Sequence, residues 1–148
     1  MILKVILNTL YAFIASLGFG VLFNIKGKNL IFASIGGGLG WLFYLICLNN
    51  QFSDTYSLFI ASLIVSLFSE IMARSFKAPV TVFIICSILP LVPGGGMYYT
   101  MLESVKGNID KSINLGVHTL INAGSIAVAI VLVSSLFKLI TFYKFNKK

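Results

Sequence analysis

Ionised side chains divide this sequence into five long runs that contain no charge. A helix needs about 20 apolar residues to cross a bilayer, and four of the runs reach that length directly. The third run reaches it only by including Glu70, so the last turn of that helix is expected at a membrane interface. We therefore predict membrane spans at about 5–25, 29–49, 54–74, 78–102 and 114–138.

The composition excludes a soluble enzyme. Of 148 residues, 58% are hydrophobic and 10% are charged, whereas about a quarter of a soluble domain is usually charged. We predict an all-α integral membrane protein, a single membrane domain over residues 1–148 built as a bundle of about five transmembrane helices. Four spans are the alternative, because Gly36, Gly37, Gly38 and Gly40 weaken the second run as a helix.

Lysine and arginine are distributed unequally between the two ends of the predicted spans, and such an excess is typical of the cytoplasmic side. One side holds three basic residues: Lys4, Lys106 and Lys111. The other side holds eight: Lys26, Lys28, Arg74, Lys77, Lys138, Lys144, Lys147 and Lys148. We therefore expect a multi-pass membrane protein with its N-terminus outside and its C-terminus in the cytoplasm. The net charge of +7 is then explained by anionic lipid and requires no nucleic-acid partner.

The first run is longer than the apolar core of a signal peptide, so we interpret it as a retained helix. No nucleotide-binding or hydrolase motif occurs in the chain, and its single histidine and four acids are scattered. We therefore predict no enzymatic activity, no cofactor and no metal site. Cys47 and Cys86 lie in different spans and are expected to be buried, unpaired thiols.

Small residues at a spacing of four favour close helix packing in membranes. Ser16 and Gly20 form one such pair, and Gly36 and Gly40 form another. We expect both pairs to bring helix backbones together and not to bind a solute.

Two pairs of polar residues inside the spans each have two interpretations. Glu70 and Arg74 are four residues apart, so they form either an interfacial anchor or a proton-coupling group or cytoplasmic gate. Glu70 is the only acid that we expect near the membrane interior. His118 and Asn122 are also four residues apart, with Ser125 on the same stripe, and they either bond to a neighbouring helix or line a solute path.

The segment 88–101 contains two prolines and three consecutive glycines within the fourth run. Each proline removes a backbone donor, and the glycines remove most of the bias toward helix. A regular helix cannot continue through Pro90–Gly96, so we predict a helix that is broken there. Broken backbone at this depth needs a covering of protein or a water-filled cavity.

Broken helices at the membrane midplane are how many secondary transporters build their binding sites. A half-helix that begins near Gly95 or Gly96 would offer free N–H groups to the carboxylate of an amino acid or organic acid. The alternative is a plain proline kink, or two short segments that meet at a loop.

Three stretches of this sequence resemble the threonine/serine exporter family, and more narrowly its small YjjB-like subunit. They are residues 18–24 (GFGVLFN), 73–79 (ARSFKAP) and 90–94 (PLVPG), the last followed by Tyr98 and Met101. The likeness extends from the first predicted helix to the end of the fifth. At single positions, Asn24, Pro79, Pro90, Pro93 and Gly94 match the family pattern.

The resemblance implies proton-driven export of small metabolites, with threonine and serine as the first choice and a C4-dicarboxylate such as succinate as the second. It also implies a companion, the larger YjjP-like subunit, and a location in the bacterial inner membrane. We expect Asn24, Pro90, Pro93, Gly94, Gly95, Gly96 and Tyr98 to bind substrate, and Glu70, Arg74, His118 and Asn122 to act in coupling or gating. The other classes that remain open are a membrane scaffold without a substrate site and a homo-oligomeric channel.

Overall fold

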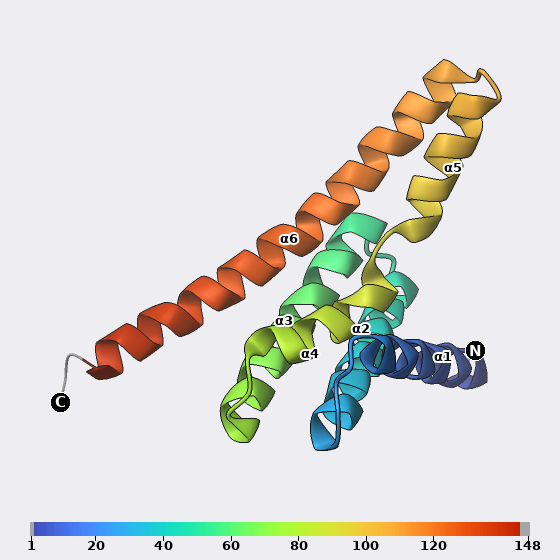
Figure 1. Ribbon diagram of the computed structural model, residues 1–148. Helices are drawn as coiled ribbons and strands as arrows, with labels where there is room; N and C mark the ends of the chain where they lie inside the picture. Colours follow the sequence, from blue (N-terminus) through green and yellow to red (C-terminus); the bar gives the residue numbers. More distant parts are fainter. Residues whose placement is uncertain (1, 146–148) are drawn as a thin grey trace.

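The computed structural model describes residues 2–145, and every regular element within that range is a helix (Figure 1). The elements are α1 (Ile2–Leu22), α2 (Lys28–Asn49), α3 (Asp54–Phe76), α4 (Val80–Ile88), the 3₁₀ turn η1 (Leu89–Leu91), α5 (Gly94–Val105) and α6 (Ile109–Phe145).

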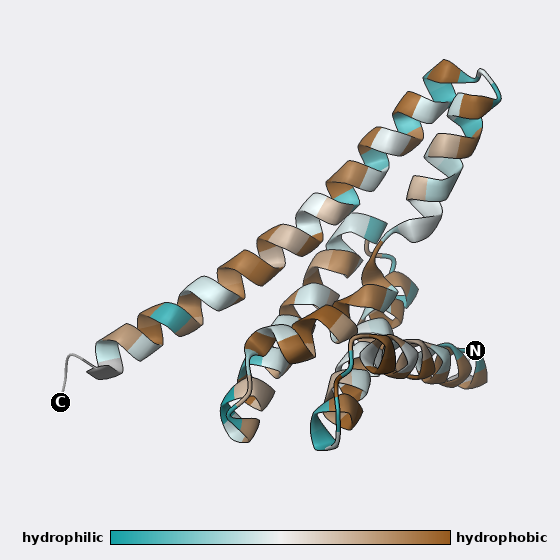
Figure 2. Ribbon diagram, viewed as in Figure 1, coloured by the Kyte–Doolittle hydropathy of each residue, from teal (hydrophilic) through white to brown (hydrophobic). Residues whose placement is uncertain are grey.

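Four of these helices, α1, α2, α3 and α6, are long and apolar enough to cross a membrane. The segments Val80–Leu91 and Gly94–Val105 qualify only together, as a pair bent by 53°, so the structure contains four spans, or five if the bent pair is one span. Hydrophilic residues gather near the turns, while long hydrophobic stretches cover the helices (Figure 2). The predicted all-helical membrane fold is confirmed. The orientation and the single-domain organisation stay predictions.

Helix α2 packs against α1, α3 and α4, and its glycines permit these close approaches. A Cβ atom at Gly36 would overlap the side chain of Ser87, which donates a hydrogen bond to the carbonyl oxygen of Ala33 at 2.8 Å. A Cβ atom at Gly40 would overlap Val65 of α3. Close contacts of the same kind join Gly37 to Ser16 and Gly20 to Leu30. The small residues therefore serve helix packing, as the sequence indicates.

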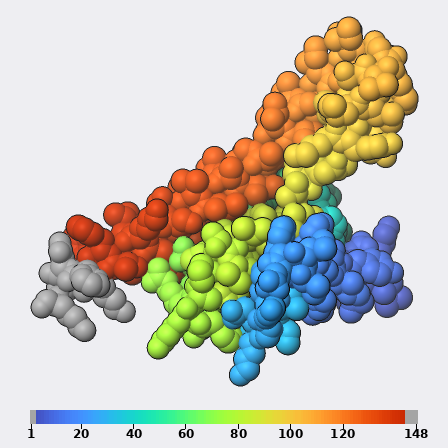
Figure 3. Space-filling model, in the orientation of Figure 1, coloured from blue at the N-terminus to red at the C-terminus, as the bar shows by residue number. Residues whose placement is uncertain are grey.

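Helices α5 and α6 form an antiparallel hairpin that projects beyond the other helices (Figures 1 and 3). Within residues 2–145, α5 packs against α6 alone, whereas α6 continues along α3. Small and polar groups face each other inside the hairpin: Gly96 abuts Thr119, and Ser112 donates a hydrogen bond to the carbonyl oxygen of Thr100 at 2.8 Å. The large apolar side chains point outward. We call residues 94–121 the α5–α6 arm.

The tip of the α5–α6 arm is held by the buried carboxylate of Glu103. This carboxylate accepts a hydrogen bond from the Asn108 amide at 2.8 Å and lies 3.5 Å from the Lys106 ammonium and 3.4 Å from that of Lys111. The turn between the two helices is therefore tied together by polar contacts, as expected for the end of a membrane hairpin.

The α1–α2 and α3–α4 turns lie at the same end of the molecule, where the rings of Phe32 and Phe76 approach to 4.8 Å between centroids. Arg74 donates a hydrogen bond to Thr141 at 3.3 Å, which brings the last turns of α6 to this end as well. We call it the basic end, after Lys26, Lys28, Arg74, Lys77 and Lys138. In the predicted orientation, all five of these residues lie on the cytoplasmic side.

Candidate functional site

The helix that begins at Val80 is interrupted where the prolines and glycines predict. Helix α4 ends at Ile88, η1 carries Pro90, and the chain is extended at Val92 before α5 begins at Gly94 with Pro93 as its N-cap. Leu91 is buried in the same cluster as Leu58, Ala61 and Val65 of α3. The break therefore lies beside the first half of α3.

The first turn of α5 presents backbone donors at this break. The N–H groups of Gly95 and Gly96 have no carbonyl one turn earlier within α5 to which they could donate. The helix dipole adds partial positive charge at the same place. A Cβ at Gly94 or Gly95 would meet no atom within 4 Å apart from the adjoining backbone of the same helix, whereas a Cβ at Gly96 would overlap Thr119. Gly94 and Gly95 thus border open space, and Gly96 is required for packing against α6.

Asp54, the first residue of α3, joins three helices through its carboxylate. Its Oδ1 accepts a hydrogen bond from the Tyr44 hydroxyl of α2 at 2.6 Å, and its Oδ2 accepts one from the Asn122 amide of α6 at 2.7 Å. The Thr55 hydroxyl donates to Asn122 Oδ1 at 2.6 Å. A carboxylate in the first turn of a helix is favoured by the helix dipole. Asp54 is therefore held as an acceptor in a fixed position.

His118 and Trp41 extend this polar group. Nδ1 of His118 lies 3.4 Å from the Asn122 amide nitrogen, and the imidazole remains exposed. The indole Nε1 of Trp41 is buried and has no hydrogen-bond partner among the described residues. An unpaired buried donor costs free energy, so an acceptor supplied by a bound molecule would stabilise it.

These groups surround a cavity of about 260 Å³, which we call the break cavity. The break cavity is lined by Trp41, Tyr44, Asp54, Leu58, Pro90, Leu91, Val92, Pro93, Gly94, Gly95, Gly96, His118, Thr119 and Asn122. Trp41 and Pro90 also line a second cavity of about 310 Å³ next to Asn8 and Tyr11 of α1. The break cavity combines a carboxylate with the positive end of a helix, so it is complementary to a small molecule that carries both charges.

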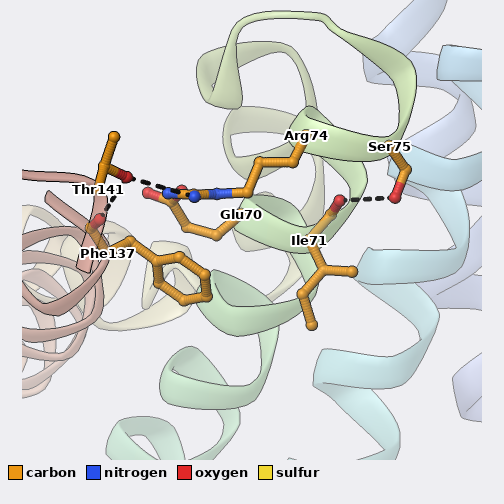
Figure 4. A network of polar contacts seen from close by, with 6 residues as sticks. All are labelled: Glu70, Ile71, Arg74, Ser75, Phe137 and Thr141. Carbon is orange, nitrogen blue, oxygen red and sulfur yellow. Dashed lines mark hydrogen bonds and ion pairs between the residues drawn. The ribbon is translucent and has the colours of Figure 1, made fainter. Parts of the chain in front are cut away.

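Glu70 and Arg74 lie elsewhere, at the basic end, in the group of polar contacts drawn in Figure 4. The Glu70 carboxylate is buried and lies 3.5 Å from the Arg74 guanidinium, which bridges to Thr141 of α6. The predicted pair therefore exists, and it joins α3 to α6 away from the break.

The structure brings most of the predicted substrate-binding residues together, along with two of the predicted coupling residues. Pro90, Pro93, Gly94, Gly95, Gly96, His118 and Asn122 all line the break cavity. Asn24 and Tyr98 do not line it. Asn24 occupies the α1–α2 turn in a left-handed conformation with φ of 57°, and Tyr98 faces outward from the α5–α6 arm with 62% of its surface exposed.

Asp54, Trp41 and Tyr44 also line the break cavity but were not among the predicted site residues. Asp54 did not stand out in the sequence, because an acid at the end of an apolar run resembles a solvated turn residue. Ser53 is the N-cap of α3 and accepts a hydrogen bond from the Tyr56 N–H at 3.5 Å, so a Ser-Asp helix start is the local signal that places Asp54. Within residues 2–145, no three histidine, cysteine or acidic residues group as metal ligands, and both cysteines are buried and free.

Comparison with known proteins matches this chain to a family model and to distant relatives, one of which is described here. A family model described as "Threonine/Serine exporter, ThrE" matches residues 8–136. A protein of Haemophilus influenzae whose printed name is "Uncharacterized protein" is 26% identical over 133 residues, which are 87% of this chain and 45% of that protein. This chain thus spans about half the length of that relative. No solved structure matches.

Proposed function

Since this chain belongs to the threonine/serine exporter family, we propose that it is the membrane subunit of a secondary exporter that holds threonine or serine in the break cavity. The family is one of transporters. The observation that carries the proposal is one small cavity lined by both the Asp54 carboxylate and the first turn of α5, where the helix dipole is positive.

In this proposal, the two ends of the amino acid bind different walls. The α-carboxylate accepts hydrogen bonds from the N–H groups of Gly95 and Gly96 and lies at the positive end of the α5 dipole. The α-ammonium faces the Asp54 carboxylate, and the side-chain hydroxyl has Asn122 and the Trp41 indole as partners. A charge-assisted hydrogen bond at each end would fix the orientation of the solute.

The same geometry favours an amino acid over a C4-dicarboxylate. A molecule with two carboxylates would place its second negative charge near Asp54, where like charges repel. Succinate is therefore the second candidate within the same mechanism, and it would require a cation that offsets the Asp54 charge.

The proposal includes a companion subunit and the proton motive force as the source of energy. The chain spans only 45% of its relative's length, which supports a larger YjjP-like partner that supplies the other half of the pathway. The proposed location is a bacterial inner membrane, where such a gradient exists.

The test is efflux of labelled threonine from preloaded cells that lack their own exporters. The cells express this chain alone, the companion alone, or both, with and without a protonophore. We expect efflux only with both chains and collapse of that efflux with the protonophore. Efflux from this chain alone without dependence on the gradient would indicate a homo-oligomeric channel, and unchanged transport without this chain would indicate a scaffold.

A substitution inside the break cavity tests its place in the pathway. Gly94→Leu should abolish threonine efflux because leucine would fill the open space beside Gly94. Gly124→Leu is the matched control, since Gly124 of α6 also borders open space but does not line the cavity. Normal efflux by a stably inserted Gly94→Leu variant would contradict binding at the break.

A further inference from the structure

A separate cavity of about 590 Å³ lies at the basic end, between the last turns of α3, the beginning of α4 and the last turns of α6. We call it the basic-end cavity. Its polar lining includes Glu70, Arg74 and Lys138, and its apolar lining includes Val80, Phe137 and Phe142. It shares no lining residue with the break cavity, so the proposed solute site does not explain it.

Contacts from two helices hold the Arg74 guanidinium in place at this cavity. Its Nη2 lies 3.5 Å from Glu70, its Nη1 donates to Thr141 at 3.3 Å, and its central carbon lies 4.6 Å from the ring centroid of Phe137 (Figure 4). The Arg74 side chain remains 48% exposed. The guanidinium is therefore positioned in advance and still has donors to offer an anion.

The charges of the basic-end cavity do not cancel. Glu70 offsets Arg74, while no carboxylate within residues 2–145 forms an ion pair with Lys138. Two cations and one carboxylate leave one positive charge. A single phosphodiester, which carries one negative charge, matches that excess. Basic cavities between helices at the cytoplasmic side of a membrane are a known type of lipid headgroup site.

The apolar walls indicate that the anion is attached to a hydrocarbon chain. Val80 and Phe142 border the cavity, and the exposed side chains of Leu139 and Ile140 continue an apolar surface along α6. A free phosphate ion would leave this surface unused. We infer that the basic-end cavity binds an anionic phospholipid, with its phosphate between Arg74 and Lys138 and an acyl chain along α6.

The experiment uses the full chain purified in detergent and follows its thermal unfolding. Phosphatidylglycerol, phosphatidylcholine and inorganic phosphate are added separately. We expect only phosphatidylglycerol to raise the Tm. In Lys138→Gln, the phosphatidylglycerol concentration for half of the effect should rise about fivefold, since one cation near the phosphate is lost.

Lys77→Gln is the matched control, because Lys77 is exposed at the same end but does not line the cavity. It should respond to phosphatidylglycerol like the unchanged protein. Equal protection by phosphatidylcholine or by inorganic phosphate would overturn the inference. So would a Lys77→Gln variant that loses as much response as Lys138→Gln, since the effect would then be diffuse charge and not a site.

Discussion

Among single residues, Asp54 has the most direct link to the proposed solute, because its carboxylate lines the break cavity and is held by Tyr44 and Asn122. Asp54→Asn keeps the shape of the side chain and removes its charge. We expect threonine efflux to fall about 10- to 100-fold, the effect of one lost charge-assisted hydrogen bond. Initial efflux rates at matched membrane levels provide the measurement.

Asp110→Asn is the control for this substitution, because Asp110 is an exposed acid in the first turn of α6 and does not line the cavity. It should export threonine normally. An Asp54→Asn variant that exports as well as the Asp110→Asn variant would exclude an ionic role for Asp54.

Glu70 should behave differently, since its carboxylate faces Arg74 at 3.5 Å and does not line the break cavity. We expect Glu70→Gln to lower the free energy of unfolding by at most about 1 kcal/mol, because its partner is half exposed. The pH profile of threonine efflux should stay unchanged. A flattened pH profile in Glu70→Gln would instead identify Glu70 as the proton-coupling group.

The properties of single residues indicate part of the candidate site, but not the residues that reach it through long-range contacts. Pro90 and Gly94 stand out because their backbone properties act locally, whatever surrounds them. Asp54 acquires its place through Asn122, which is 68 residues away in the chain. No local pattern contains such a pairing, since it depends on which face of α6 packs against α3.

At the level of elements, the contact between α5 and α6 depends on Gly96, where a Cβ would overlap Thr119. Gly96→Ala should therefore lower the free energy of unfolding by about 1–3 kcal/mol, the usual effect of overpacking. Thermal or denaturant unfolding in detergent measures the change.

Two matched variants separate this contact from general helix effects. Gly95→Ala borders open space and should be neutral or stabilising, because alanine favours helix. Thr119→Ala added to Gly96→Ala should restore stability by removing the atoms that clash. If the double variant is no more stable than Gly96→Ala alone, the hairpin does not pack as described.

The elements themselves follow closely from the sequence, and their ends follow less well. Charge-free runs predict where helices can cross a membrane, and two prolines with three glycines predict the interruption between Ile88 and Gly94. The length of α6, which continues from Ile109 to Phe145, is not apparent from the fifth run alone. Polar residues at both ends of that run are compatible with helix and do not terminate it.

In the whole molecule, the large apolar side chains of the α5–α6 arm face away from every other described helix. Inside the hairpin, Gly96 abuts Thr119 and Ser112 bonds to Thr100, whereas Met101 on the outer surface is 67% exposed. This arrangement is not apparent from the sequence, because an apolar helix surface packs equally well against lipid, against the same chain or against another chain.

The proposed companion is the partner that would best cover this surface. The chain spans only about half of its relative's length, and a companion that supplies the other membrane half would contact this chain near the break. A photo-crosslinking side chain at Met101 should therefore form an adduct with the companion when both are expressed in cells. The same group at Leu3 of α1, which is 70% exposed, is the control and should form none. An adduct at Met101 between two copies of this chain, with or without the companion, would instead assign the arm to a homo-oligomer. The break cavity of a second copy would then complete the pathway.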